Sequence, residues 1–198
     1  MAHIDKKHKR NEDVKNSIDI GSDMISEDIT LQKARPWYLT EEEGSNLNKD
    51  NAVTLKELFD GKKVVVFGVP APFTGTCTNE HYPPYKEKAD EFLKEGVGKI
   101  VCYSVSDPYA HHAWAKALNN DFDKIQFLAD ADASFAHEYG LEMDASVVAL
   151  GTRSQRFSML VENGIVKIFR IIGPEDDASK DAEMLLGDIK KVHSDEGS

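Results

Sequence analysis

Runs of apolar residues alternate along this chain with segments whose apolar positions recur every three or four residues. The first two runs are rich in β-branched and aromatic side chains and nearly free of charge, which is typical of strands buried on both faces. The last two runs are joined by Asn163-Gly164, a dipeptide that favours the tight turn of a β-hairpin. We therefore predict strands at residues 63–69, 99–106, 126–130, 156–162 and 165–170.

The segments between the runs are predicted to be helices. Thr54 and Glu57 have the spacing of a capping box and open a short helix that ends at Gly61. In the longest segment, Pro83 and Pro84 are expected to kink or break the helix after its first turn. The other predicted helices cover residues 77–95, 111–118, 133–139 and 181–192.

This order of elements indicates the fold class. Strands alternating with helices and then followed by a hairpin and a helix make a βαβ half joined to a ββα half. That is the plan of an α/β thioredoxin-like fold, with a central mixed β-sheet flanked by helices on both faces. Residues 1–34 are polar with scattered apolar positions, so we expect a flexible N-terminal extension and one domain at residues 35–198.

Composition narrows the functional classes. The chain has 24 Lys and Arg against 35 Asp and Glu, a net charge of −11, which opposes binding to nucleic acid or to anionic membranes. The longest apolar stretch, near residues 64–73, is too short for a membrane span, and no secretory hydrophobic region follows Met1. Two cysteines without a disulfide framework indicate a reducing compartment, for which we expect the cytoplasm, with organellar targeting by the extension left open.

Cys77 is the candidate for chemistry. It follows a buried strand that Pro70 and Pro72 end, and the turn at residues 74–76 places it in the first turn of the next helix. Unpaired N–H groups at a helix start favour a thiolate over a thiol, and a thiolate is the nucleophile. The hydroxyl of Thr74, three residues earlier, can hydrogen-bond to the sulfur or to an incoming oxygen, or act as a turn or N-cap residue.

These residues resemble the peroxiredoxin family. The pattern Pro70-x-x-x-Thr74-x-x-Cys77 is similar to the peroxiredoxin active-site motif, and Phe67-Gly68-Val69 before it and His81 with Pro83 after it resemble the type-5 (plant type II) subfamily. Further matching segments, in the order that subfamily shows, extend the likeness over roughly residues 52–192. They are Leu58-Phe59-x-Gly61-Lys62-Lys63, Ser104-Val105-Ser106-Asp107, Trp114, Leu128-Ala129-Asp130 and Arg156-Phe157-Ser158-Met159.

The resemblance implies a thiol-dependent peroxidase without a metal or cofactor. Cys77 would attack hydrogen peroxide or an alkyl hydroperoxide and become a sulfenic acid, while Thr74 binds the reacting oxygens and Pro70 shields the thiolate from water. Arg156 would supply positive charge, and only the family pattern favours it over nearby Arg153. The resemblance also implies a homodimer, to which the apolar loops at residues 70–73 and 108–109 would contribute.

The second thiol bears on the mechanism. Cys102 lies between Val101 and Tyr103 in a predicted strand, so we expect a packing residue and a one-cysteine mechanism. An external thiol, either glutathione with glutaredoxin or thioredoxin, would then regenerate Cys77. The chain departs from the subfamily at Pro72 and Gly75, which leaves the stiffness of the active-site loop open.

Three other functions fit part of the pattern. A disulfide reductase needs a second cysteine three residues after Cys77, and that position is Glu80. A metal site would have Cys77 and His81 as ligands, with His111 and His112 elsewhere, too few at one place for a closed site. A redox-sensing or chaperone-like partner protein would use Cys77 as a regulated thiol without turnover.

Overall fold

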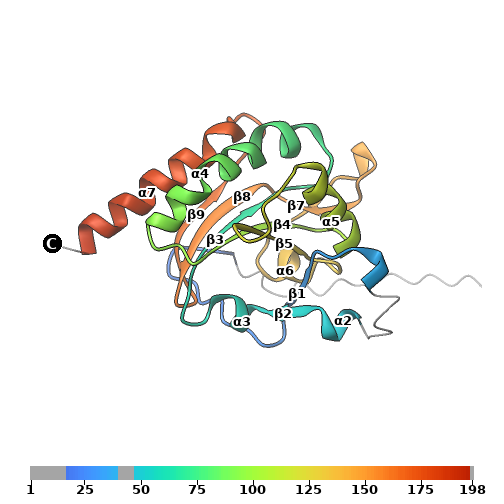
Figure 1. The fold of residues 1–198 in the computed structure, drawn as a ribbon, viewed down its shortest axis with the longest axis horizontal. Helices are drawn as coiled ribbons and strands as arrows, with labels where there is room; N and C mark the ends of the chain where they lie inside the picture. The colour runs from blue at the N-terminus through green and yellow to red at the C-terminus, as the bar shows by residue number, and fades with distance from the viewer. Residues whose placement is uncertain (1–16, 40–46, 197–198) are drawn as a thin grey trace, which may run out of the picture.

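The computed structural model describes residues 17–39 and 47–196, and a seven-stranded sheet forms its centre (Figure 1). The strand order is β2-β1-β5-β4-β3-β8-β9, in which β3, β4 and β5 run parallel and the remaining pairs are antiparallel. The predicted mixed sheet is therefore confirmed. Its strands are β1 (Thr30–Lys33), β2 (Ala52–Thr54), β3 (Lys63–Gly68), β4 (Lys99–Ser104), β5 (Ile125–Ala129), β8 (Phe157–Glu162) and β9 (Ile165–Ile171).

Helices cover both faces of this sheet. Side chains of α4, α5 and α7 share one buried cluster with Phe67 of β3, whereas side chains of α3 and α6 share the opposite cluster with Val66. Alternate residues of β3 enter the two clusters because successive strand side chains point to opposite faces. The helices are α2 (Leu47–Asp50), α3 (Leu55–Phe59), α4 (Tyr82–Lys94), α5 (Pro108–Ala117), α6 (Ser134–Glu138) and α7 (Asp181–Glu196).

The described part of the N-terminal segment differs from the expected extension. Thr30–Lys33 forms β1, which pairs with both β2 and β5, and Met24 is fully buried. The few apolar side chains of this segment are too scattered to form a core of their own, but they pack against a sheet face that the rest of the chain builds. The ordered fold thus begins before residue 35, and residues 1–16 lie outside the described part.

The helix that starts near Cys77 is not broken by its prolines. Residues Cys77–His81 form a π-helical turn, η1, in which the N–H of Tyr82 bonds to the Cys77 carbonyl. Pro83 and Pro84 are then the second and third residues of α4, within its first turn, where a missing backbone N–H costs little. The wide turn carries the chain into α4 without the predicted break, and it is the place where the regular α-helical pattern is interrupted.

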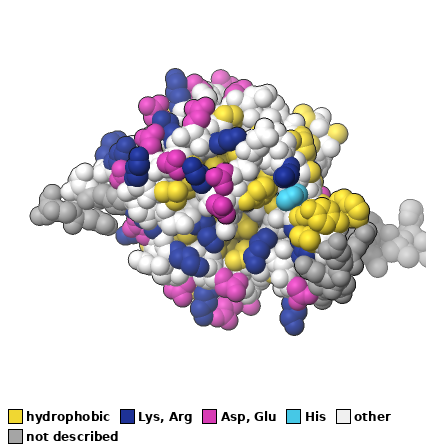
Figure 2. Space-filling model, in the orientation of Figure 1, with side chains coloured by type: hydrophobic (Ala, Val, Ile, Leu, Met, Phe, Trp, Pro, Cys, Tyr) yellow, Lys and Arg dark blue, Asp and Glu magenta, His cyan; other side chains and the backbone are white. Residues whose placement is uncertain are grey.

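Two smaller features complete the fold. Strands β6 (Glu142–Asp144) and β7 (Thr152–Ser154) form a two-stranded antiparallel sheet that the hydrophobic pattern did not predict. Short helical turns lie at η2 (Ser146–Val148) and η3 (Ala178–Lys180). On the face drawn in Figure 2, acidic and basic side chains are interspersed. Within the described residues, no helix is both long and apolar enough to cross a bilayer.

Candidate active site

The register of two neighbouring strands brings Arg156 to the loop that precedes Cys77. Gly68, at the end of β3, is paired with Phe157, at the start of β8. Arg156 therefore lies just beyond the sheet, beside the chain as it leaves β3. The pairing requires a glycine at position 68, because a Cβ there would come within 2.1 Å of the Phe157 ring.

The loop after β3 turns sharply and starts the helix that holds Cys77. Phe73 has the left-handed φ of 62°, and the Thr74 carbonyl accepts a hydrogen bond of 3.0 Å from the N–H of Thr78. Cys77 thus lies in the first helical turn, as predicted, with only 1% of its surface exposed. The Thr74 hydroxyl donates to the Ala71 carbonyl at 2.9 Å, so here it stabilises the turn while its own oxygen can still accept a hydrogen bond.

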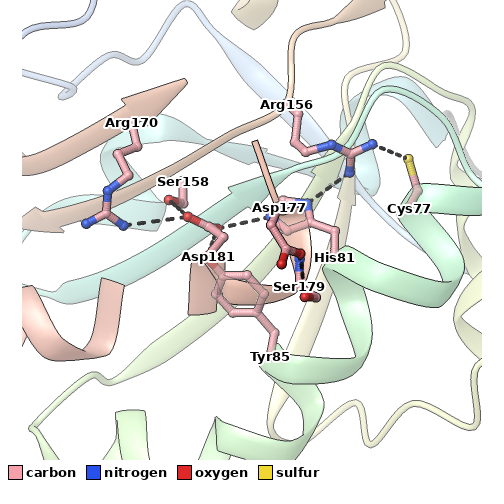
Figure 3. A network of polar contacts seen from close by, with 9 residues as sticks. All are labelled: Cys77, His81, Tyr85, Arg156, Ser158, Arg170, Asp177, Ser179 and Asp181. Atoms are coloured by element: carbon pink, nitrogen blue, oxygen red, sulfur yellow. Dashed lines mark hydrogen bonds and ion pairs between the residues drawn. The ribbon is translucent and has the colours of Figure 1, made fainter. Parts of the chain in front are cut away.

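The guanidinium of Arg156 donates hydrogen bonds to two neighbouring side chains. Its NH2 group donates to Cys77 Sγ at 3.4 Å, and its NH1 group donates to His81 Nδ1 at 3.1 Å (Figure 3). Arginine is positively charged at working pH, so the sulfur has a cation directly beside it. Cys77 and Arg156, which are 79 positions apart in the sequence, are therefore brought together as the resemblance implied.

The contacts of His81 define its tautomer. A guanidinium has no acceptor, so Nδ1 must accept the hydrogen bond from Arg156, and a neutral ring then carries its proton on Nε2. Nε2 lies 3.0 Å from Asp181 Oδ2, to which it donates. Burial is the main cause that lowers the pKa of His81 below its ordinary value, and the nearby Arg156 acts in the same direction, although Asp181 opposes them.

Asp181, the first residue of α7, is almost fully buried but has several polar partners (Figure 3). The Tyr85 hydroxyl donates to Oδ2 at 2.5 Å, the Ser158 hydroxyl donates to Oδ1 at 2.8 Å, and Arg170 NH1 lies 3.6 Å from Oδ1. Burial acts to raise the pKa of Asp181, but the hydrogen bonds from His81, Tyr85 and Ser158 contribute to a net lowering. The carboxylate is thus held ionised inside the protein.

Sequence reasoning considered His81 only as part of the motif and as a possible metal ligand, and it did not select Asp181. His81 was part of the motif, but its partners are 75 and 100 residues away along the chain. A local sequence pattern cannot predict contacts between residues so far apart along the chain. The one signal in the sequence was the position of Asp181 at the start of an amphipathic helix, where an acidic residue is ordinarily explained by the helix dipole.

A hollow of about 430 Å³ opens beside the guanidinium of Arg156. Pro70 and Thr76 line it on the side of the Cys77 loop, and Met143 and Ile171 add apolar surface. Cys77 is not among its lining residues, and its partly apolar wall can contact an alkyl group.

Cys102 and Arg153 do not join this site. Cys102 lies in β4, paired with Phe67 of β3, and is fully buried. Burial is the main reason that the pKa of its thiol lies well above the ordinary value. Arg153 Nε donates to the Leu150 carbonyl at 2.9 Å, and its NH1 group donates to the Val105 carbonyl. Both residues are thus held by the scaffold.

The described residues contain no group of three or more His, Cys, Asp and Glu side chains arranged to hold a metal ion. Cys77 and His81 both face Arg156, whose positive charge disfavours a cation between them. His111 lies elsewhere, with its Nε2 donating to the Cys102 carbonyl at 3.1 Å.

Comparison with known proteins finds relatives that match most of this chain. Residues 39–186 match the family described as Redoxin. The mitochondrial peroxiredoxin-2F of Oryza sativa subsp. japonica is 41% identical over 176 residues, which are 87% of this chain and 86% of that relative. The mitochondrial peroxiredoxin-2F of Arabidopsis thaliana is 41% identical over 162 residues, which are 81% of this chain and 78% of that relative.

Solved structures give the same result for the fold. Reduced Prx3 from Vibrio vulnificus in complex with hydrogen peroxide superposes with a TM-score of 0.73 at 34% identity, covering 89% of this chain and 98% of that one. Peroxiredoxin 5 from Alvinella pompejana superposes with a TM-score of 0.70 at 25% identity, covering 88% and 99%. The predicted thioredoxin-like fold is confirmed.

Proposed function

Because this chain belongs to the redoxin family and is a peroxiredoxin, a thiol peroxidase, we propose that Cys77 is its peroxidatic cysteine and that it works by a one-cysteine mechanism. The observation that carries this assignment is the 3.4 Å contact between Arg156 NH2 and Cys77 Sγ. Cys77 is the cysteine at a helix start and beside a cation, whereas Cys102 is enclosed in the sheet. The resemblance to type II peroxiredoxins noted from the motifs is itself confirmed.

The reaction is a displacement at oxygen. The Cys77 thiolate attacks one peroxide oxygen, an S–O bond forms, and the O–O bond breaks with its electron pair going to the departing oxygen. That oxygen leaves as hydroxide or alkoxide and takes up a proton. Negative charge therefore moves away from sulfur, and Arg156 stabilises it at both ends because its donors are already oriented. The products are the Cys77 sulfenic acid and water or an alcohol.

Two further residues of the motif have proposed roles around this reaction. Pro70 lines the hollow beside Arg156 and would keep water from the thiolate, since its ring has no backbone N–H to attract water. Thr74 would accept a hydrogen bond from the peroxide hydroxyl while it continues to donate to Ala71. Hydrogen peroxide and alkyl hydroperoxides are the proposed substrates, and the partly apolar hollow beside Arg156 could accommodate the alkyl group of the latter.

The sulfenic acid is then reduced by an external thiol. A first thiol displaces water from the Cys77 sulfenic acid to form a mixed disulfide, and a second thiol releases the Cys77 thiolate. The burial of Cys102 supports this route over an internal disulfide. The reductant is proposed to be glutathione with glutaredoxin, or thioredoxin.

Two measurements test this mechanism. Under peroxide without reductant, the intact mass should rise by one oxygen and then by two, all at Cys77, whereas a dominant Cys77–Cys102 disulfide would contradict the one-cysteine route. Peroxide consumption coupled to glutaredoxin with glutathione should then be compared with consumption coupled to thioredoxin. Sustained consumption with either supports a peroxidase, and oxidation of Cys77 without any turnover would instead support a redox-sensing protein.

We also propose a homodimer with the active-site loops at its interface. Phe73, directly before Thr74 in the loop that leads to Cys77, exposes 60% of its surface. Large apolar side chains so exposed near a site are typical of an interface. Of the other predicted interface residues, Pro108 is buried within the chain, so the support comes mainly from Phe73.

The proposed location is the cytoplasm or another reducing compartment. Two unpaired thiols fit such a compartment. The two plant relatives are named as mitochondrial proteins, so an organelle is the alternative. Fluorescence microscopy of the full chain, compared with a chain that lacks residues 1–16, distinguishes the two locations.

A further inference from the structure

A chain of polar contacts leads from the sulfur of Cys77 into the interior of the protein. It runs from Cys77 Sγ to Arg156, from Arg156 to His81 Nδ1, and from His81 Nε2 to Asp181, with distances of 3.4, 3.1 and 3.0 Å (Figure 3). His81 and Asp181 are buried, and the hydrogen bond that reaches the sulfur comes from Arg156. His81 and Asp181 can therefore act on Cys77 through Arg156.

We propose that His81 and Asp181 are positioning residues, which hold the guanidinium of Arg156 in the orientation that directs its NH2 group at Cys77. This inference rests on the proposed role of Cys77 and Arg156. It adds that the neutral Nε2–H tautomer of His81 is required, because only that form offers Nδ1 as an acceptor to Arg156.

Arg156 needs such support because its side chain is long and only half-buried. An arginine with one partner can rotate about its last bonds and lose the alignment of its other donors. The second contact, from NH1 to His81, restricts these rotations, so that NH2 remains directed toward Sγ. Correct orientation of the guanidinium should raise the rate of peroxide reduction by a large factor, since a displacement of about 1 Å in a reacting group can lower a rate about a hundredfold.

Asp181 sets the tautomer of His81. A carboxylate only accepts, so the ring nitrogen facing it must carry the proton. Asp181 is itself held by hydrogen bonds from Tyr85 of α4 and Ser158 of β8, and the positive charge of Arg170 of β9 lies 3.6 Å from Oδ1. These contacts tie the orientation of Arg156 to the packing of α7 against the sheet.

A pair of substitutions at His81 separates positioning from simple packing. In His81→Asn, the amide oxygen can replace Nδ1 as the acceptor for Arg156. In His81→Gln, the longer side chain places its amide at the Nε2 end, where it meets Asp181 and leaves Arg156 without an acceptor. We expect the Gln variant to reduce peroxide about tenfold to a hundredfold more slowly than the wild type in a single turnover. The Asn variant should retain several times the rate of the Gln variant.

The titration midpoint of the Cys77 thiol, from the pH dependence of its alkylation rate, is the second readout. It should move upward in His81→Gln and less in His81→Asn, because a misdirected guanidinium stabilises the thiolate less. The matched control is His111→Asn, since His111 is equally buried but bonds to the Cys102 carbonyl. That variant should lose thermal stability without moving the midpoint.

Two outcomes overturn the proposal. One is a His81→Gln variant with the wild-type rate and midpoint. The other is an equal loss of rate in both His81 variants with an unmoved midpoint, which would assign His81 to packing alone. Cys77→Ser distinguishes these results from failure of the proposed function, because residual activity in that variant would remove Cys77 itself from the mechanism.

Discussion

Replacement of Arg156 by methionine should raise the titration midpoint of Cys77 and slow peroxide reduction severely. Methionine keeps much of the length and volume of the side chain while it removes the charge and all the donors. The substitution eliminates the hydrogen bond from NH2 to Sγ, in which the two atoms are 3.4 Å apart. At that separation and an effective dielectric constant of about 20, a unit-charge pair attracts by about 5 kcal/mol.

Solvent reduces this value, because Arg156 is half-buried and its charge is partly screened. A remaining stabilisation of about 1.4 to 3 kcal/mol in the transition state corresponds to a loss of about tenfold to a hundredfold in the rate of peroxide reduction. The rate loss includes a second effect, since Arg156 also stabilises charge on the departing oxygen. Removing one oriented donor to developing charge commonly costs about a hundredfold or more.

The assay is the alkylation rate of Cys77 as a function of pH, with single-turnover peroxide reduction measured on the same samples. Arg153→Met is the control, because Arg153 donates to the carbonyls of Leu150 and Val105 and does not contact Cys77. It should leave the midpoint near that of the wild type. An unchanged midpoint in Arg156→Met would refute the reasoning and assign the cation to another residue.

Three other predictions follow from the structure. Gly68→Ala should lower the free energy of unfolding by about 1–3 kcal/mol, because the added Cβ would overlap the Phe157 ring. Urea unfolding measures this free energy, and a value equal to that of the wild type would contradict the prediction. Burial lowers the pKa of His111 to about 4, so the folded state binds fewer protons than the unfolded state between that value and about 6.5. Stability should therefore fall by about 3 kcal/mol as pH drops through this range, and His111→Asn should lack that part of the loss; parallel stability curves for the two proteins would show that His111 is not responsible. Light scattering at micromolar concentration should give about twice the chain mass, and a monomer with full activity would exclude the dimer proposed around Phe73.

The sheet and the position of Cys77 were accessible from sequence because the signals for them are local. After Lys63, the run that continues to residue 69 is uncharged and apolar, and Asn163-Gly164 marks the turn of the later hairpin with two residues. The structure has strand β3 at Lys63–Gly68 and the hairpin between β8 and β9. A cysteine directly after a buried strand and at a helix start is likewise visible within a few positions.

The parts that were missed depend on contacts between distant segments. Thr30–Lys33 has a polar composition and becomes a strand because β2 and β5 offer it partners. The π turn at Cys77–His81 accommodates two prolines for which local rules predict a break. The hydrogen bond between His81 and Asp181 spans 100 residues, and each of them alone has an ordinary explanation as a polar helix residue.

The central claim is that Cys77 alone carries the peroxidase reaction. The direct measurement is single-turnover peroxide consumption by Cys77→Ser and Cys102→Ser, each compared with the wild type. We expect no consumption above background in Cys77→Ser and most of the wild-type amplitude in Cys102→Ser, since Cys102 lies in the sheet, whereas the Arg156 guanidinium is directed at Cys77. Comparable losses in the two variants, or consumption that survives in Cys77→Ser, would contradict the account.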